Sequence, residues 1–174
     1  MSRGPSRSSP AIISPRGYLP IWETAARLRP DWSFVLIGYA YDGESEKVHA
    51  RIRELPNMYF LGAKSYQELP KYLANFDVAT IPFVLNSITH GCSPVKLFEY
   101  MAAGKPIVCT PMREILKYES IHFAASPADF VREIESAVAG KDDPAGQALL
   151  AREAKENTWR SRAEKLKSAL QRKR

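Results

Sequence analysis

The chain has 174 residues, which fits one domain, and it lacks any apolar run near the ~20 residues of a membrane-spanning helix. Its formal net charge is +6, but residues 1–17 carry +3 and residues 160–174 carry +6, so the residues between them carry −3. This distribution argues against nucleic acid as a partner of the folded body. The two cysteines, Cys92 and Cys109, lack metal-ligand or disulfide spacing, which favours a reducing, cytoplasmic location.

The two ends of the chain hold the excess positive charge. Residues 1–17 are rich in arginine, serine and proline and show no periodicity. We therefore predict a disordered basic arm, or a sequence foreign to the domain, followed by a single domain over residues 18–174. The first strand of that domain is then missing, or is poorly represented by residues 11–13. Basic ends suit peripheral contact with the anionic inner face of a membrane, but solvated ends are the simpler interpretation.

Apolar runs and helical patterns alternate along the domain. The apolar runs predict strands at residues 34–38, 58–61, 78–82, 107–110 and 121–124. Helices are predicted at residues 22–28, 46–55, 65–76, 94–103, 126–139, 144–156 and 160–170, the last ones closing the domain. Ser65 and Glu68 predict a capping box, and residues 39–45 and 83–92 predict loops. Strands separated by helices indicate an α/β fold, a Rossmann-like three-layer α/β/α arrangement with a mainly parallel sheet.

The segment that begins at Ser93 carries the strongest functional signal. Ser93 is a good helix N-cap, Pro94 suits the first helical position, and Gly104 ends the helix. Lys96 and Glu99 are three residues apart, so they share one face of this helix. The helix starts from the third predicted loop at the carboxyl ends of the strands, where ligands of such sheets bind. The residues alone therefore predict an anion, above all a phosphate, at this helix end.

Residues 93–108 resemble the donor-binding helix of GT-B-fold glycosyltransferases of the family 4/1-like group. Residues 32–38, 55–62, 69–82 and 157–159 are similar to other parts of that family's nucleotide-binding domain, so the resemblance covers residues 19–170. It implies one half of a GT-B fold, the half that binds a UDP- or GDP-linked sugar for transfer with retention. It also implies a separate N-terminal acceptor domain, without which we expect this chain to be inactive.

The resemblance and the helix chemistry together assign donor-binding roles. Backbone N–H groups of Val95 and Lys96, beside Ser93 and Pro94, are expected to hold the diphosphate, and the Lys96 cation neutralises its charge. The resemblance implies that Glu99 accepts hydrogen bonds from two ribose hydroxyls. The alternative for Lys96 is an ordinary solvent-exposed lysine, and the alternative for Glu99 is a surface glutamate paired with Lys96 or Lys105.

Other site residues are weaker candidates. Gly38 and Gly62 are expected where the base or phosphate approaches, although turn chemistry also explains them. Phe83 is expected near the base or sugar, or packed under its loop. The sequence identifies no catalytic residue. His90 lies alone in a predicted loop, and such a histidine is more often incidental than catalytic. No Asp-x-Asp cluster is present, so we expect neither a metal nor a cofactor besides the nucleotide-sugar.

The sequence departs from the broad family pattern at one position. Gly91 stands where many relatives have a sugar-binding glutamate, eight residues before Glu99. A narrower group that includes enzymes of polysaccharide and cell-wall polymer assembly has Asn/Ser-Pro-Val-Lys there instead, as this chain does. Two alternative functions stay open: a non-enzymatic nucleotide-sugar-binding subunit, and a structural α/β domain in which Lys96 and Glu99 merely pair.

Overall fold

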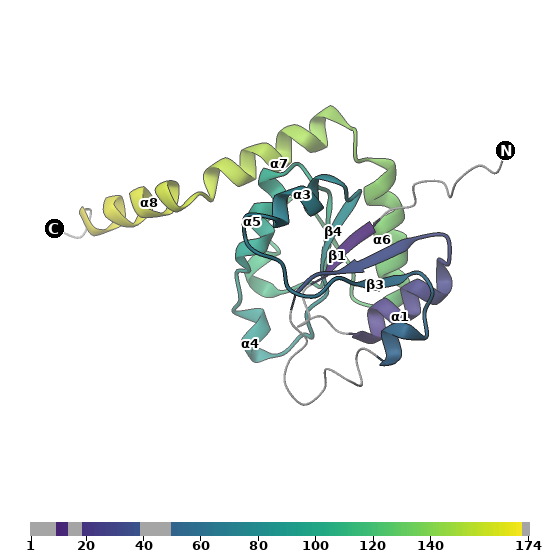
Figure 1. The fold of residues 1–174 in the computed structure, drawn as a ribbon. Helices are drawn as coiled ribbons and strands as arrows, with labels where there is room; N and C mark the ends of the chain where they lie inside the picture. Colours follow the sequence, from purple (N-terminus) through teal and green to yellow (C-terminus); the bar gives the residue numbers. More distant parts are fainter. Residues whose placement is uncertain (1–9, 14–18, 39–49, 172–174) are drawn as a thin grey trace.

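The computed structural model describes residues 10–13, 19–38 and 50–171, which form a parallel sheet covered by helices (Figure 1). The strands are β1 (Pro10–Ile13), β2 (Ser33–Leu36), β3 (Met58–Phe60), β4 (Val78–Ile81), β5 (Ile107–Cys109) and β6 (Ile121–Phe123). All neighbouring strands pair in parallel, in the order β3-β2-β1-β4-β5-β6. The order in which strands are added reverses between β1 and β4. The chain adds β2 and β3 beyond β1 on one side, and β5 and β6 beyond β4 on the other.

Helices cover both faces of this sheet. They are α1 (Leu19–Leu28), α3 (Leu69–Ala74), α4 (Ser87–His90), α5 (Val95–Ala102), α6 (Pro127–Ala139), α7 (Pro144–Glu156) and α8 (Trp159–Gln171), with a 3₁₀ turn at Arg113–Ile115 and helical residues at 50–53. α1 packs against α6 on one face, and α5 packs against α7 on the other. The predicted three-layer α/β/α class is therefore confirmed.

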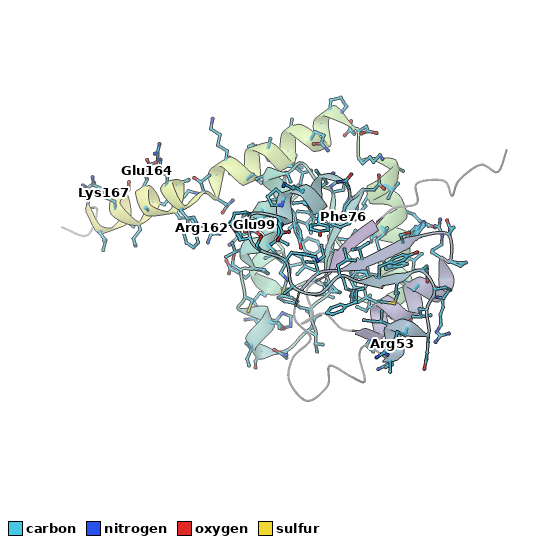
Figure 2. All side chains as sticks on the ribbon, viewed as in Figure 1. Arg53, Phe76, Glu99, Arg162, Glu164 and Lys167 are labelled. Atoms are coloured by element: carbon cyan, nitrogen blue, oxygen red, sulfur yellow. The ribbon has the colours of Figure 1, made fainter. Side chains whose placement is uncertain are left out.

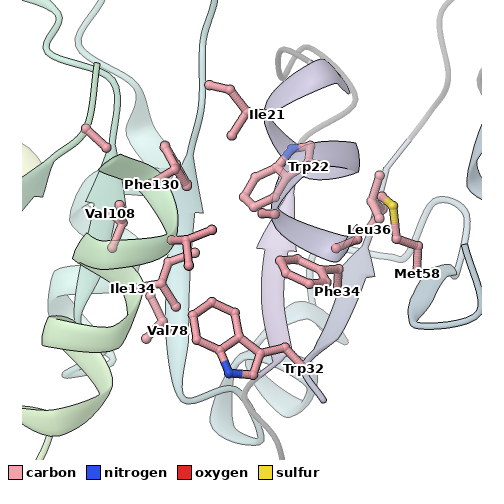
Figure 3. Close-up of a cluster of buried hydrophobic side chains, with 14 of the residues drawn as sticks. Ile21, Trp22, Trp32, Phe34, Leu36, Met58, Val78, Val108, Phe130 and Ile134 are labelled. Atoms are coloured by element: carbon pink, nitrogen blue, oxygen red, sulfur yellow. The ribbon is translucent and has the colours of Figure 1, made fainter. Parts of the chain in front are cut away.

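Two apolar clusters, one on each face, hold the layers together. On the α1/α6 face, Trp22 and Phe130 meet edge to face with ring centroids 5.3 Å apart, close to Phe34 of β2 (Figure 3). Alternate residues of β4 point to opposite faces, so Val78 joins this cluster and Ala79 joins the other. Strands that are buried on both faces have continuous apolar sequences, and for this reason most of them could be predicted from the sequence.

The prediction of a disordered arm over residues 1–17 is wrong for Pro10–Ile13. These residues form β1, which pairs with both β2 and β4, so that Ile12 lies opposite Val35 and Ala79. Residues 11–13 thus supply the first strand, at the centre of the sheet. A strand of four residues gives little local signal, and its conformation depends on backbone pairing with both neighbours. The rest of the predicted arm, the loop at 39–45 and the start of the helix at 46–55 lie outside the described residues.

The secondary structure of two segments differs from the prediction. Residues 83–92 contain α4, whose N-cap Asn86 forms a reciprocal capping box with Thr89. The helix predicted from Ser65 begins only at Leu69, because residues 66–68 form a turn and Pro70 sits in the first helical turn. The Glu68 carboxylate still accepts bonds from the Ser65 N–H and hydroxyl, at 3.0 and 2.6 Å.

The last helix, α8, extends away from the body of the domain (Figures 1 and 2). Its apolar side chains Trp159, Leu166 and Leu170 are exposed, and none of its residues is buried. The Arg162 guanidinium lies over the Phe98 ring of α5, 4.5 Å from the ring centroid. Over the ranges that the structure describes, we find no helix with the length and apolar character needed to cross a bilayer. Contact of the basic ends with a membrane surface stays a prediction.

Candidate functional site

The candidate site lies at the switch point of the sheet, between β1 and β4, where the order in which strands are added reverses. In open parallel sheets a crevice forms at this point beyond the carboxyl ends of the strands, and ligands bind there. The loop that leaves β4 leads through α4 into α5, so α5 starts beyond the carboxyl end of β4. Phe83 follows β4 directly, while Lys96 and Glu99 lie on the first two turns of α5.

The start of α5 differs from the prediction. Pro94 is the N-cap, with an extended backbone (φ −65°, ψ 128°), and its carbonyl oxygen accepts from the Leu97 N–H at 3.0 Å. Ser93 therefore precedes the cap and is not the N-cap, and Pro94 is not the first helical residue. A capping side chain must come from the N-cap itself, and proline has none to offer. Val95, the first helical residue, is 52% exposed, so this end of the helix faces outward.

Lys96 and Phe83 lie together at this helix end. The Lys96 Nζ lies 5.1 Å from the centroid of the Phe83 ring, within the range of a cation–π contact. Phe83 is itself fixed, because its carbonyl oxygen accepts from the Thr110 hydroxyl at 2.9 Å and its N–H donates to the Ile81 carbonyl. The structure thus brings a cation and an aromatic ring from two elements to one place.

Glu99 receives a hydrogen bond that the sequence analysis missed. The Tyr66 hydroxyl, from the turn before α3, donates to Glu99 Oε1 at 2.9 Å. This bond and the nearby negative charge raise the pKa of Tyr66 above its ordinary value. The suggested pairing of Glu99 with Lys105 does not form, because the Lys105 ammonium donates to the Ala74 and Phe76 carbonyl oxygens, at 2.9 and 2.7 Å.

Gly38 and Gly62 follow the carboxyl ends of β2 and β3. The Gly38 N–H donates to the Gly62 carbonyl oxygen at 3.0 Å, which ties the two loops together. Gly62 has φ +67°, a conformation that favours glycine, and a Cβ at this position would meet nothing within 4 Å. Its conformation therefore requires glycine, while the space above it is open.

The polar residues of the β4–α5 loop mainly stabilise the loop itself. Asn86 and Thr89 satisfy each other's backbone N–H groups, and the Thr89 hydroxyl also donates to the Val84 carbonyl at 2.6 Å. His90 Nδ1 accepts from the Arg113 backbone N–H at 3.3 Å, so the proton of the neutral ring is on Nε2. These contacts explain the residues without a ligand, and they give His90 no catalytic partner.

A cavity of about 1090 Å³ lies at the opposite, amino edge of the sheet. Several of its polar residues are bonded to one another and to backbone: Lys141 pairs with Asp77 at 2.7 Å, and the Gln147 amide donates to the Gly104 and Lys141 carbonyls. The size of the cavity does not make it the site, because these polar groups already have partners within the chain. Among the described residues there is no group of three or more metal-ligating side chains.

Known proteins resemble this chain over most of its length. A family model described as glycosyl transferases group 1 matches residues 16–140. TuaH of Bacillus subtilis (strain 168), whose name describes a teichuronic acid biosynthesis glycosyltransferase, is 27% identical over 153 residues, covering 84% of this chain and 38% of TuaH.

Solved structures of other proteins share the fold, and two of them illustrate it. Anabaena Alr3699/HepE in complex with UDP-glucose has a TM-score of 0.61 and 20% identity over 84% of this chain and 43% of its own. The catalytic domain of the cholesterol-α-glucosyltransferase of Helicobacter pylori has a TM-score of 0.65 and 16% identity, over 88% of this chain and 100% of that one. The chain therefore spans about two fifths of the length of TuaH and HepE.

Proposed function

Because the chain belongs to the glycosyl transferases group 1 family, we propose that it is the donor-binding domain of an enzyme that transfers a sugar from a UDP-linked donor. The observation that carries this proposal is the placement of Lys96 and Glu99 on one face of α5, at the switch point of the sheet. HepE, which shares the fold, was solved with UDP-glucose, and this favours UDP over GDP.

The diphosphate of the donor binds at the outward-facing start of α5. The first N–H groups of a helix have no acceptor within it, and the helix dipole favours an anion at this end. The Lys96 ammonium, held over Phe83, adds a positive charge next to the phosphates. When the bond to the sugar breaks, negative charge grows on the nucleoside diphosphate, so these groups stabilise the leaving group more strongly than the bound substrate.

The nucleoside binds across the site towards Gly62. Glu99 is one turn further along α5 than Lys96, so a ribose attached to the diphosphate can reach its carboxylate. The base then lies over the backbone at residues 62–65, where the open space above Gly62 supports a close approach. Backbone contacts of this kind select the base without a diagnostic side chain.

We further propose that the sugar is transferred with retention to a growing polysaccharide or cell-wall polymer, bound by a separate acceptor domain. The name of TuaH supports this acceptor class. The acceptor domain is needed because the closed cleft between two domains excludes water from the transfer. A binding subunit that acts with a separate enzyme uses the same donor site and differs only in the absence of transfer.

Thermal unfolding with nucleotides tests the proposal. A ligand that binds only the folded chain adds about 2.7 kcal/mol to its stability at 100 times its dissociation constant. UDP is expected to raise the melting temperature, and GDP and ADP are expected to raise it less. Lys96→Ala and Glu99→Ala should each weaken UDP binding by about 1–3 kcal/mol, the effect of losing a charged hydrogen bond.

Lys155→Ala is the matched control, since it removes an exposed helical lysine of α7. It should leave the shift with UDP unchanged. A folded wild-type chain whose melting temperature responds to no nucleotide, or responds equally in the Lys96→Ala variant, contradicts the proposed donor site. Sugar transfer by the 174-residue chain alone contradicts the need for an acceptor domain.

A further inference from the structure

Tyr66 connects two elements of the site that are far apart in sequence. It lies in the turn between β3 and α3, and its side chain is 69% exposed. Its hydroxyl donates to Glu99 Oε1 on α5 at 2.9 Å. The turn that carries it is fixed by the bonds from Ser65 to the Glu68 carboxylate, so the ring leaves from a defined backbone position. Among the described residues, this exposed ring belongs to neither apolar cluster, and its hydroxyl is bonded to Glu99.

This contact limits the freedom of the Glu99 side chain. A glutamate on the surface of a helix ordinarily samples several rotamers, and ordering it on binding costs conformational entropy. A carboxylate has two oxygens with about four acceptor positions, and one phenol occupies one of them. The Tyr66 bond therefore fixes the direction of the carboxylate while leaving it the capacity to accept from both hydroxyls of a ribose.

We propose that Tyr66 is a positioning residue for ribose recognition, holding the Glu99 carboxylate in the orientation that accepts from the vicinal 2′- and 3′-hydroxyls of the donor. This inference rests on the proposed function, in which Glu99 binds the ribose. Tyr66 itself touches neither the diphosphate nor the sugar that is transferred. Its effect is on discrimination, because a fixed carboxylate responds more strongly to the loss of one hydroxyl than a mobile one does.

The alternative to positioning is competition. In that role the Tyr66 phenol occupies the ribose position and must leave before the donor binds. The two roles predict changes of opposite sign when the hydroxyl is removed. Loss of a positioning bond weakens binding of a ribonucleotide, whereas loss of a competitor strengthens it. The substitution Tyr66→Phe separates them, since it removes the hydroxyl and keeps the ring.

The test is calorimetric titration of the 174-residue chain with UDP and with 2′-deoxy-UDP. For Tyr66→Phe we expect the dissociation constant for UDP to rise about threefold to tenfold, the effect of one hydrogen bond. We expect a smaller rise for 2′-deoxy-UDP, so that the preference for UDP falls. In a Glu99→Ala background, which removes the acceptor of the Tyr66 hydroxyl, the same substitution should have little further effect on the UDP dissociation constant, because the two residues act through one contact.

The control is Tyr59→Phe, a change in a half-exposed tyrosine of β3, at the opposite edge of the sheet. It should leave both dissociation constants unchanged. Tighter UDP binding by Tyr66→Phe, an unchanged preference for UDP, or an equal loss in the Glu99→Ala background overturns the positioning role. If the folded wild-type chain binds no UDP, the proposed function fails and this inference fails with it, whereas normal UDP binding with a silent Tyr66→Phe overturns this inference alone.

Discussion

At the amino edge of the sheet, Lys105 and Gln147 donate to backbone carbonyl oxygens, and Lys141 pairs with Asp77. At the carboxyl edge, the cation of Lys96 lies over an aromatic ring, and Glu99 accepts from an exposed tyrosine. Backbone carbonyls cannot move away from a cation without deforming the fold, but an exposed side chain can rotate. The contacts of the amino edge are therefore expected to contribute more to the stability of the fold than those of the carboxyl edge.

The largest effect on stability is expected from Lys105→Ala. The substitution removes two charge-assisted hydrogen bonds and leaves the Ala74 and Phe76 carbonyls without this donor. We expect the free energy of unfolding to fall by about 2–3 kcal/mol, measured by urea denaturation. Lys96→Ala should lower it by no more than about 0.5 kcal/mol, because surface substitutions usually have effects of this size. Equal losses for the two lysines contradict the division between the edges.

A smaller decrease in the free energy of unfolding is expected from Gly104→Ala at the end of α5. Gly104 has φ +63°, and the N–H groups of Gly104 and Lys105 donate to the Met101 and Tyr100 carbonyls in a helix-ending Schellman motif. An added Cβ would lie 2.7 Å from the Gln147 Oε1. We expect a loss of about 1–2 kcal/mol from the backbone strain, with further cost if Gln147 must move.

Gly62→Ala is the matched substitution at the carboxyl edge. Its φ of +67° brings a similar strain, but open space surrounds the new methyl group. We expect it to lose less stability than Gly104→Ala and to weaken UDP binding, which Gly104→Ala should leave nearly unchanged. Urea denaturation and UDP titration of both variants check this, and a Gly62→Ala variant that binds UDP normally would contradict the proposed place of the nucleoside.

A weak effect is expected from breaking the Asp77–Lys141 pair. Its side chains are 23% and 38% exposed, so water screens the attraction between them. Asp77→Asn should therefore lower the free energy of unfolding by no more than about 1 kcal/mol, the upper range for exposed pairs. High salt should reduce the difference between this variant and the wild type, whereas an effect that persists in salt would show that the pair is not a surface ion pair.

The sequence predicted most strands and the helix that carries Lys96 and Glu99, because these depend on local patterns. Continuous apolar runs locate buried parallel strands, and the spacing of Lys96 and Glu99 places them on one helix face whatever surrounds them. The features that it missed depend on contacts between distant segments. β1 is specified by pairing with β2 and β4, and the bond from Tyr66 joins residues 33 positions apart.

The error at Ser93 has a local cause. A serine followed by proline matches both the N-cap and the first helical position, and the sequence offers no means of deciding whether the helix starts one residue later. In the structure Pro94 is extended and takes the N-cap position, so Ser93 lies outside the helix. Lys96 and Glu99 keep their relative spacing for either start, so the hypothesis of a donor site on this helix does not depend on the error.

The smallest effect, and the most specific one, concerns the titration of Tyr66. The hydrogen bond to the Glu99 carboxylate and its charge favour the neutral phenol, so the pKa of Tyr66 is raised above about 10, the value for an unperturbed tyrosine. The resulting stabilisation is complete below the unfolded pKa and is lost as the pH rises through the folded pKa. Ultraviolet absorbance of tyrosinate, taken as the difference between the wild type and Tyr66→Phe, reports this titration.

In the Glu99→Gln background the same difference should titrate near the ordinary pKa, because the carboxylate that favours the neutral phenol is gone. With saturating UDP, a positioning role requires Tyr66 to keep its bond to Glu99, so its pKa should stay raised. A competing role requires the phenol to leave the carboxylate, and the pKa should then fall towards its ordinary value. The titration thus asks whether this contact of the carboxyl edge persists or rearranges when the donor nucleotide binds.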